Sequence, residues 1–341
     1  PGMTPKVVAE IGQCAEGDLD LAIRLVEECA EAGCWGVKVQ VLEPDLIAHP
    51  SAEKYWEHGD DRTQAEVFDD NGSLTLDELT VLGDIVRIEL GMIYIATPFD
   101  ENSVEVCVQA GVQMLKIASG DITNIPLLRA VNATRLPVIL STGAASFPEI
   151  CAAVHELEHV DTLLACSLQY PTVDAAVTGF WRMEALAEAF GLPVGYSDHT
   201  LGTWSAPILT ALGATMIEKH VTHSEVATTD VPDHEMALRF PELCEFVSLA
   251  EEADAAIDAS SAEMTYHGEE AARHGARRSL WWSADLPVGT VITAEDVSVL
   301  RPGPIDGRIG AADWDDVVGA RVTRRVVAGA GVMPSEVARA V

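Results

Sequence analysis

The stretch GYSDHTLGTWSAPILTALGATMIEKHVT, residues 195–222, decides the fold. Apolar runs at 192–196 and 214–217 predict two strands, and residues 204–212 predict a helix between them. Strands joined in this way are parallel neighbours, so the polar clusters that follow them, SDHT and EKH, meet at one edge of the sheet. His199 and His220 at that edge are candidate ligands of a divalent metal. Two strand-end histidines hydrogen-bonded to the backbone are an equally good interpretation of this unit alone.

The alternation of apolar strand and helix begins near the start of the chain and repeats eight times. It predicts an α/β fold, a (β/α)8 TIM barrel over residues 1–259. A doubly wound open sheet is the alternative, but no GxGxxG turn follows the first strand. The predicted strands are 6–11, 36–41, 92–97, 114–118, 136–142, 162–167, 192–196 and 214–217. The predicted helices are 19–31, 76–90, 103–110, 126–132, 147–157, 180–190, 204–212 and 241–259.

Three further segments stand apart from this rhythm. Residues 44–73 are too long for a plain connection, so we expect a functional loop there. Residues 260–277 are rich in Ala, Glu and His without apolar periodicity and predict a helical linker. From 278 to 341 short β-like runs alternate with turns, and RRVVAGAGVMPSEV loosely repeats LPVGTVITAEDV. We therefore expect a small, β-rich, pseudo-symmetric second domain.

The composition excludes several classes of partner. The formal net charge of −33 argues against nucleic acids and anionic membranes. No apolar run is long enough to span a membrane, and the start of the chain shows no secretory signal. Seven cysteines without a CxxC pair are typical of a reducing compartment, so we expect a cytoplasmic protein.

Nearly every predicted barrel strand ends in a polar residue, at the edge where TIM barrels carry their active sites. Only five lysines occur in the chain, and three of them, Lys38, Lys116 and Lys219, lie at strand ends. Lysines and hydroxyls together favour a phosphate with a nearby carboxylate; lysines that extend from barrel ends into solvent are the simpler alternative. The complete rim set is Glu10, Lys38, Gln40, Thr97, Lys116, Ser119, Ser141, Thr142, Cys166, Tyr170, Ser197, His199 and His220.

Within this set we expect the two histidines to form a metal site left open for substrate, and Glu10 is placed where a general base or a ligand for hydroxyl groups is needed. Cys166 is interpreted as a wall residue, because nothing in the sequence indicates a lowered thiol pKa. His155 and His159, one helical turn apart among glutamates, are expected on a solvated surface. His234 is a further candidate for the rim.

Eight stretches form a specific combination: AEIG (9–12), AGCWGVKVQ (32–40), ATPFDENSV (96–104), LKIASGDITNIPLL (115–128), LPVILSTGAA (136–145), GLPVGYSDHTLG (191–202), ALGATMIEKHVT (211–222) and PDH (232–234). Together they resemble the sialic acid synthase family. RRSLWW (277–282) and LPVGTVITAEDVSVLRPG (286–303) resemble its antifreeze-like (SAF) domain. The resemblance covers practically the whole chain. It implies condensation of phosphoenolpyruvate (PEP) with an aldose such as N-acetylmannosamine, giving a nonulosonic acid and phosphate.

The resemblance also implies roles for individual residues. His199 and His220 would hold a divalent metal, Mn²⁺ with Mg²⁺ or Co²⁺ as alternatives, and Glu10 would contact metal-bound water or sugar hydroxyls. Arg301 of a partner subunit would reach the acylamino group in a domain-swapped homodimer. The PEP residues would be Lys38, Thr97, Lys116, Ser119, Ser141 and Ser197, with Gln40 beside them and Asp121, Tyr170 and Asp233 as further substrate-binding residues.

The chain departs from the family pattern mainly on the sugar side. QCAEG (13–17) replaces an Asn-His-Asn-Gly-like segment, Leu168 replaces a polar residue, Asp121 replaces a glutamate, and residues 229–231 differ before PDH. We therefore expect the reaction to be retained with an aldehyde that need not be N-acetylmannosamine. Two alternatives stay open: a synthase acting on a phosphorylated sugar, which needs a second basic cluster, and a drifted barrel that binds an anionic metabolite without catalysis.

Overall fold

The chain forms two compact units, residues 1–259 and 260–341, and each is described by itself. The computed structural model describes residues 4–56, 61–223, 233–257 and 268–338. The altered segment 229–231 and the first part of the predicted linker therefore lie outside the described residues.

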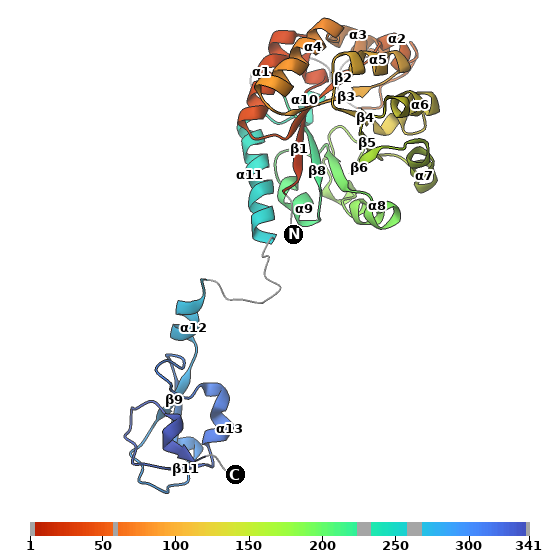
Figure 1. Cartoon of the computed structure of the whole chain (residues 1–341). Helices are drawn as coiled ribbons and strands as arrows, with labels where there is room; N and C mark the ends of the chain where they lie inside the picture. The colour runs from red at the N-terminus through yellow and green to blue at the C-terminus, as the bar shows by residue number, and fades with distance from the viewer. Residues whose placement is uncertain (1–3, 57–60, 224–232, 258–267, 339–341) are drawn as a thin grey trace. The chain divides into compact units, whose positions relative to one another are not determined.

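The first unit is a closed barrel of eight parallel strands in chain order (Figure 1). The predicted TIM barrel is thus confirmed, and every predicted strand overlaps an observed one. The strands are β1 (Lys6–Glu10), β2 (Gly36–Val41), β3 (Ile93–Pro98), β4 (Met114–Ile117), β5 (Val138–Ser141), β6 (Val160–Cys166), β7 (Val194–Asp198) and β8 (Met216–His220).

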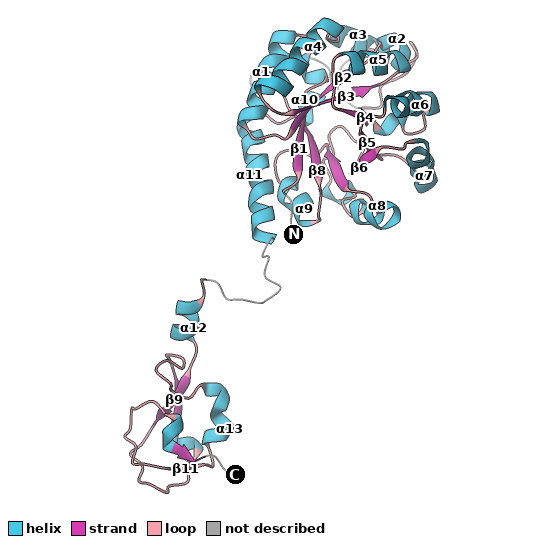
Figure 2. Cartoon of the chain, viewed as in Figure 1, coloured by secondary structure: helices cyan, strands magenta, loops and turns pink. Residues whose placement is uncertain are grey.

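Helices surround the strands on the outside of the barrel (Figure 2). All eight predicted helices are present: α1 (Leu19–Glu31), α4 (Leu76–Asp84), α5 (Glu101–Gln109), α6 (Ile125–Thr134), α7 (Phe147–Glu156), α8 (Arg182–Phe190), α9 (Ser205–Ala211) and α11 (Phe240–Ile257). α4 differs from its prediction because it passes after Asp84 into a π-helical turn, Ile85–Glu89. Three short helices are additional: α2 (Pro44–Ile47), α3 (Gln64–Asn71) and α10 (Asp233–Met236).

The segment after β2 owes its structure to local capping. Thr63 and Thr75 each begin a helix with a capping box, their hydroxyls accepting from the backbone of Glu66 and Glu78 while those carboxylates accept from the threonine backbone. The predicted functional loop is therefore partly helical.

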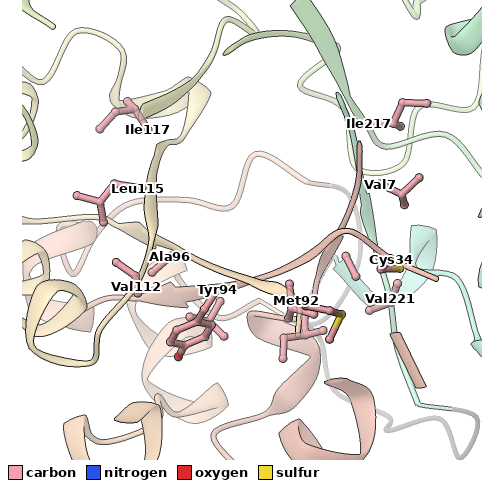
Figure 3. Close-up of a cluster of buried hydrophobic side chains, with 14 of the residues drawn as sticks. Val7, Cys34, Met92, Tyr94, Ala96, Val112, Leu115, Ile117, Ile217 and Val221 are labelled. Atoms are coloured by element: carbon pink, nitrogen blue, oxygen red, sulfur yellow. The ribbon is translucent and has the colours of Figure 1, made fainter. Parts of the chain in front are cut away.

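Two apolar cores stabilise the barrel from opposite sides of its strands. Outward-facing side chains such as Val7, Tyr94 and Leu115 pack beneath the helices (Figure 3). A smaller cluster fills the barrel interior and consists of Val8, Ile95, Met114, Ile139, Leu164 and Met216. Gly195 belongs to the same level, since a Cβ there would lie 2.1 Å from the Met216 carbonyl oxygen and 2.9 Å from Leu164. We call this interior cluster the floor.

Side chains alternate between the two faces of a strand, so residues two positions beyond the floor also face the barrel axis. These residues are Glu10, Thr97, Lys116, Ser141, Cys166 and Glu218. The same spacing carries Gly195 to Ser197 and Glu218 to His220. An apolar floor is thus followed, one step toward the carboxyl ends, by a layer of polar residues that we call the polar layer.

The second unit has its own core around Leu280, Trp282 and Val332. Two pairs of antiparallel strands form it, β9 (Ser279–Trp282) with β10 (Val297–Leu300) and β11 (Arg321–Val322) with β12 (Val337–Ala338), beside α12 (Glu270–Ala276) and α13 (Trp314–Val317).

The predicted internal repeat of this unit is visible in its backbone hydrogen bonds. Leu286 and Val326, forty positions apart in the chain, donate to each other at 3.2 and 3.1 Å. Gly289 N donates to Val322 O at 2.8 Å, and its counterpart Gly329 N donates to Trp282 O at 2.8 Å.

None of the helices within the described ranges is long and apolar enough to cross a membrane.

Candidate active site

A cavity of about 200 Å³ lies among the carboxyl-terminal ends of the barrel strands. Eleven of the predicted site residues line it: Lys38, Gln40, Thr97, Lys116, Ser119, Asp121, Tyr170, Ser197, His199, His220 and Asp233. Two predicted residues of the barrel lie just behind the wall, since Glu10 and Ser141 are 1% exposed and do not line the cavity. Arg301 is an exposed residue of the second unit, and its contact with a sugar stays a prediction.

Both lysines of the cavity are paired with buried carboxylates. Lys38 contacts Glu10 and donates to Thr97 Oγ1 at 3.1 Å. Lys116 contacts Glu218, whose second oxygen lies 3.9 Å from Lys38 Nζ. The anion site is therefore an alternating set of charges, not a cluster of free cations.

This arrangement shifts the pKa of a lysine, Lys38, and of a carboxylate, Glu218. Burial lowers the pKa of Lys38 to about 7, with neighbouring Glu218 opposing that change. Burial alone would raise the pKa of Glu218, but Lys116 and Lys38 outweigh it and lower that pKa to about 2. Glu218 is thus a carboxylate at neutral pH, and it holds both lysines at the cavity.

Glu218 is the functional residue that the sequence interpretation missed. It precedes His220 by two positions on β8, so both side chains face the cavity, whereas Lys219 between them faces outward. Lys219 instead contacts Asp198 at 2.9 Å inside the protein. The alternation rule applied to MIEKH was the available signal, and it also shows that the third strand-end lysine has a structural contact.

The hydroxyl groups near the lysines retain unused hydrogen-bonding capacity. Ser119 Oγ accepts from Gly143 N at 2.9 Å, so its own proton must point to another acceptor. Ser141 Oγ is buried and has no hydrogen-bond partner among the described residues. Ser197 Oγ donates to Glu218 at 3.0 Å. Buried polar atoms without partners are costly, and their position behind a cavity favours a polar ligand there.

The two imidazoles lie side by side, with ring centroids 5.5 Å apart. His199 Nδ1 lies 2.9 Å from the Ser167 carbonyl oxygen, which can only accept, so Nδ1 carries the proton and Nε2 carries the lone pair. Burial and then His220 lower the pKa of His199 to about 3, so its ring is neutral. His220 Nδ1 lies 3.3 Å from Asp233 Oδ2. For His199, the hydrogen bond to the backbone and a role as metal ligand are thus compatible, because Nδ1 makes the hydrogen bond and Nε2 is left for the metal.

These features fit a divalent metal whose coordination is completed from outside the protein. A second ring nitrogen held by a carbonyl oxygen, as in His199, or by a carboxylate, as in His220, is the usual arrangement of metal-ligating histidines. Within the described ranges no group of three or more His, Cys, Asp or Glu side chains is arranged to hold an ion. Two histidines alone leave most positions to substrate and water.

Aromatic side chains from the segment after β2 form the outer wall. Tyr55, Trp56 and Phe68 line the cavity. Tyr55 also packs edge-on against Tyr170, with centroids 6.2 Å apart. The expectation of a functional segment at 44–73 is consistent with this position, although its aromatic content gave no indication of which residues reach the cavity.

The remaining candidates lie outside the cavity or form its wall. His155 and His159 are exposed, as predicted. Cys166 lines the cavity, and burial raises its pKa to about 11, which suits a wall residue and not a nucleophile. His234 does not line this cavity; its Nε2 lies 3.1 Å from Glu16.

Comparison with known proteins agrees with this architecture. Residues 25–262 match the NeuB family, and residues 277–338 match the SAF domain. The chain is 32% identical to the N,N'-diacetyllegionaminic acid synthase of Legionella pneumophila, over 96% of this chain and 93% of that protein. It is 29% identical to the pseudaminic acid synthase of Helicobacter pylori, over 87% of this chain and 88% of that protein. The crystal structure of an N-acetylneuraminic acid synthetase from Leptospira borgpetersenii in complex with citrate has a TM-score of 0.69 and 29% identity, covering 78% of this chain and 89% of that one.

Proposed function

This chain belongs to the NeuB family and carries a SAF domain, and on that premise we propose that it condenses PEP with an acylamino aldose to give a nonulosonic acid and phosphate. The observation that carries the proposal is the meeting of two chemically different halves in one cavity. Lysines, hydroxyls and Glu218 form one half, and the imidazoles of His199 and His220 form the other.

The lysine half suits PEP. Lys38 and Lys116 are held in place by buried carboxylates, and Ser119 and Ser141 offer hydroxyl groups with unused capacity. We assign Lys38, Thr97, Lys116, Ser119, Ser141 and Ser197 to PEP. Fixed cations and donors of this kind stabilise the phosphate and the charge that develops at C2 during the reaction.

The imidazole half suits the aldehyde. We assign His199 and His220 to a divalent ion, Mn²⁺ with Mg²⁺ or Co²⁺ as alternatives, which would supply Lewis acidity toward the aldehyde oxygen. Asp233 would orient His220, and Tyr170, packed on His199 with centroids 4.3 Å apart, would exclude water from that side. Chelation followed by dialysis should abolish phosphate release, and Mn²⁺ should restore it; full activity in the chelated protein would refute this assignment.

The chemistry is one carbon–carbon bond formation followed by hydrolysis. C3 of PEP attacks the aldehyde carbon, and the aldehyde oxygen takes up a proton to become a hydroxyl. Water adds at C2, and the tetrahedral intermediate breaks its C–O bond to release inorganic phosphate. PEP, aldehyde and water thus give a 2-keto-3-deoxy acid and phosphate.

We further propose that the preferred aldehyde is not N-acetylmannosamine. Two of the similar proteins are named as legionaminic and pseudaminic acid synthases. Two of the residues that depart from the family pattern, Gln13 and Leu168, line the cavity, and we assign them to the sugar side. Among the described lining residues Lys38 and Lys116 are the only lysines or arginines, and both are assigned to PEP, which leaves no cation for the phosphate of a phosphorylated sugar.

Phosphate release from PEP and Mn²⁺ with a panel of aldoses tests these points. The panel contains N-acetylmannosamine, its 6-phosphate, mannose and 2,4-diacetamido-2,4,6-trideoxymannose. We expect fastest turnover with a diacylated aldose. Brisk turnover of N-acetylmannosamine alone would refute the altered substrate, and no release with any aldose would favour the non-catalytic barrel.

A further inference from the structure

Two buried side-chain amides, Gln13 and Asn71, and the half-buried amide of Gln40 form a continuous hydrogen-bonded row beside the cavity. Asn71 Nδ2 donates to Gln13 Oε1 at 2.6 Å and to the Gln13 carbonyl at 3.0 Å. Gln13 Nε2 donates to Gln40 Oε1 at 3.2 Å. Gln40 Nε2 then donates to two carboxylates, Glu10 at 3.3 Å and Asp233 at 3.4 Å. The row joins the last residue of α3 to the turn after β1, to β2 and finally to α10.

The carboxylates at one end dictate the orientation of every amide in the row. Carboxylates only accept, so Gln40 must turn its NH₂ group toward Glu10 and Asp233. Its oxygen then faces Gln13, which must donate, and the Gln13 oxygen in turn requires a donor from Asn71. Asn71 keeps this orientation even though its own Oδ1 is buried without a partner among the described residues.

Close packing prevents the Gln40 end of the row from turning. Gly12 N donates to Glu10 Oε1 at 2.6 Å, and a Cβ at position 12 would lie 2.3 Å from that oxygen and 2.4 Å from Gln40 Cγ. Gln13 and Asn71 are each 6% exposed. The Gln13 and Asn71 end of the row is therefore enclosed, and the row has a single polarity.

Gln40 is the junction between the two halves of the cavity. Through Glu10 it meets Lys38, and through Asp233 it meets His220. Lys38 has further support from Thr97 at 3.1 Å and Glu218 at 3.9 Å, so its position does not depend on the row. Asp233, in contrast, is held by Gln40 and His220.

On the basis of the proposed function, we propose that Gln13 and Asn71 are positioning residues for the aldehyde substrate, because they fix the Gln40 amide that bridges Glu10 and Asp233. Their loss should impair the imidazole half and leave the PEP half intact. Both residues act through Gln40 and Asp233 and not on the reacting atoms.

Isosteric changes from amide to acid test this row. Gln13→Glu replaces the donor that faces Gln40 by an acceptor, and Asn71→Asp removes the donor to Gln13. Gln113→Glu is the matched control, since it adds the same charge at an exposed site where the side-chain oxygen only accepts, from Tyr94 N at 3.0 Å. Phosphate release gives KM for PEP and for the panel aldose that the wild-type protein uses best, and circular dichroism gives the unfolding temperature.

We expect both row variants to raise KM for the aldose about tenfold, the effect of one mispaired buried hydrogen bond, with KM for PEP within about twofold of wild type. The control should change neither. If Gln13→Glu does not fold, Gln13→Met removes the polar groups without adding charge and should give the same division between the two KM values.

Equal rises in both KM values, or no change in either, would overturn the positioning role while leaving the proposed function standing. A wild-type protein that releases no phosphate with any aldose would overturn the proposed function and this inference together.

Discussion

The floor and the polar layer of the barrel lie two residues apart on the same strands, yet one contributes to stability and the other to ligand binding. Floor residues such as Ile139 and Met216 are fully buried apolar side chains that fill the interior. One step further, Ser141 and Glu218 occupy the same face with equal burial, but they carry an unpaired hydroxyl and a charge. The floor therefore stabilises the fold, whereas the polar layer costs stability and supplies the binding site.

The largest expected effect is in the polar layer. Lys116→Met should reduce phosphate release by about 10²–10³-fold, because it removes a fixed cation from the site that we assign to the PEP phosphate. The variant also leaves Glu218 without its closest partner. Lys116→Met combined with Glu218→Gln removes both charges, so it should fold better and stay equally inactive in a steady-state phosphate assay. Activity near the wild-type level in both variants would contradict the assignment of this layer to PEP.

A substitution in the floor should have the opposite effect: it should lower stability and leave catalysis nearly unchanged. Met216→Ala should lower the free energy of unfolding by about 2–5 kcal/mol, because it leaves a cavity in a packed interior. Urea unfolding measures this loss, and kcat measured well below the unfolding temperature should stay within about threefold of wild type. A large loss of kcat with little loss of stability would show that the two layers are not functionally separate.

Lys38, which contacts Glu10 of the polar layer, should make PEP binding dependent on pH. Burial lowers the pKa of Lys38 to about 7, so the ammonium group is present below pH 7 and is lost above it. KM for PEP should therefore rise with pH above 7, by up to about tenfold per pH unit. Lys38→Arg keeps its charge throughout this range and should flatten the profile. Identical profiles for the two proteins would assign the dependence to another group.

The smallest expected effect is the change in the free energy of unfolding when one buried hydroxyl group is removed. Ser141→Ala should raise the free energy of unfolding by about 1 kcal/mol, because it removes a buried hydroxyl for which the described residues offer no hydrogen-bond partner. The same change should raise KM for PEP. A loss of stability in chemical denaturation would mean that the hydroxyl has a partner in solution.

The sequence predicted the barrel well because apolar strand runs and helix periodicity are local signals. The rim residues followed from the rule that polar groups cluster at the carboxyl ends of parallel strands, which brought His199 and Lys116 to one cavity. Glu218 was missed because only the last residues of each predicted strand were considered. Side chains alternate between the two faces of a strand, and within MIEKH this places Glu218 on the same face as His220.

The contacts that could not be predicted are those between distant segments. Asn71 and Gln13 are 58 residues apart, and no pattern in either stretch indicates the other. The aromatic wall depends on how α2 and α3 fold back over the cavity, which tertiary packing decides. The partners of the lysines were also hidden, since a sequence shows charges but not their neighbours.

The reciprocal hydrogen bonds in the second unit have a consequence for assembly. Gly289 and Gly329 make the same bond to opposite halves, and so do Leu286 and Val326, which is the pattern of an isologous dimer. The two halves, whose equivalent positions lie forty residues apart, thus behave as subunits that a short connection holds at high effective concentration. Neither half can satisfy its backbone alone, so separated halves should be unfolded at low concentration and should regain structure only when mixed.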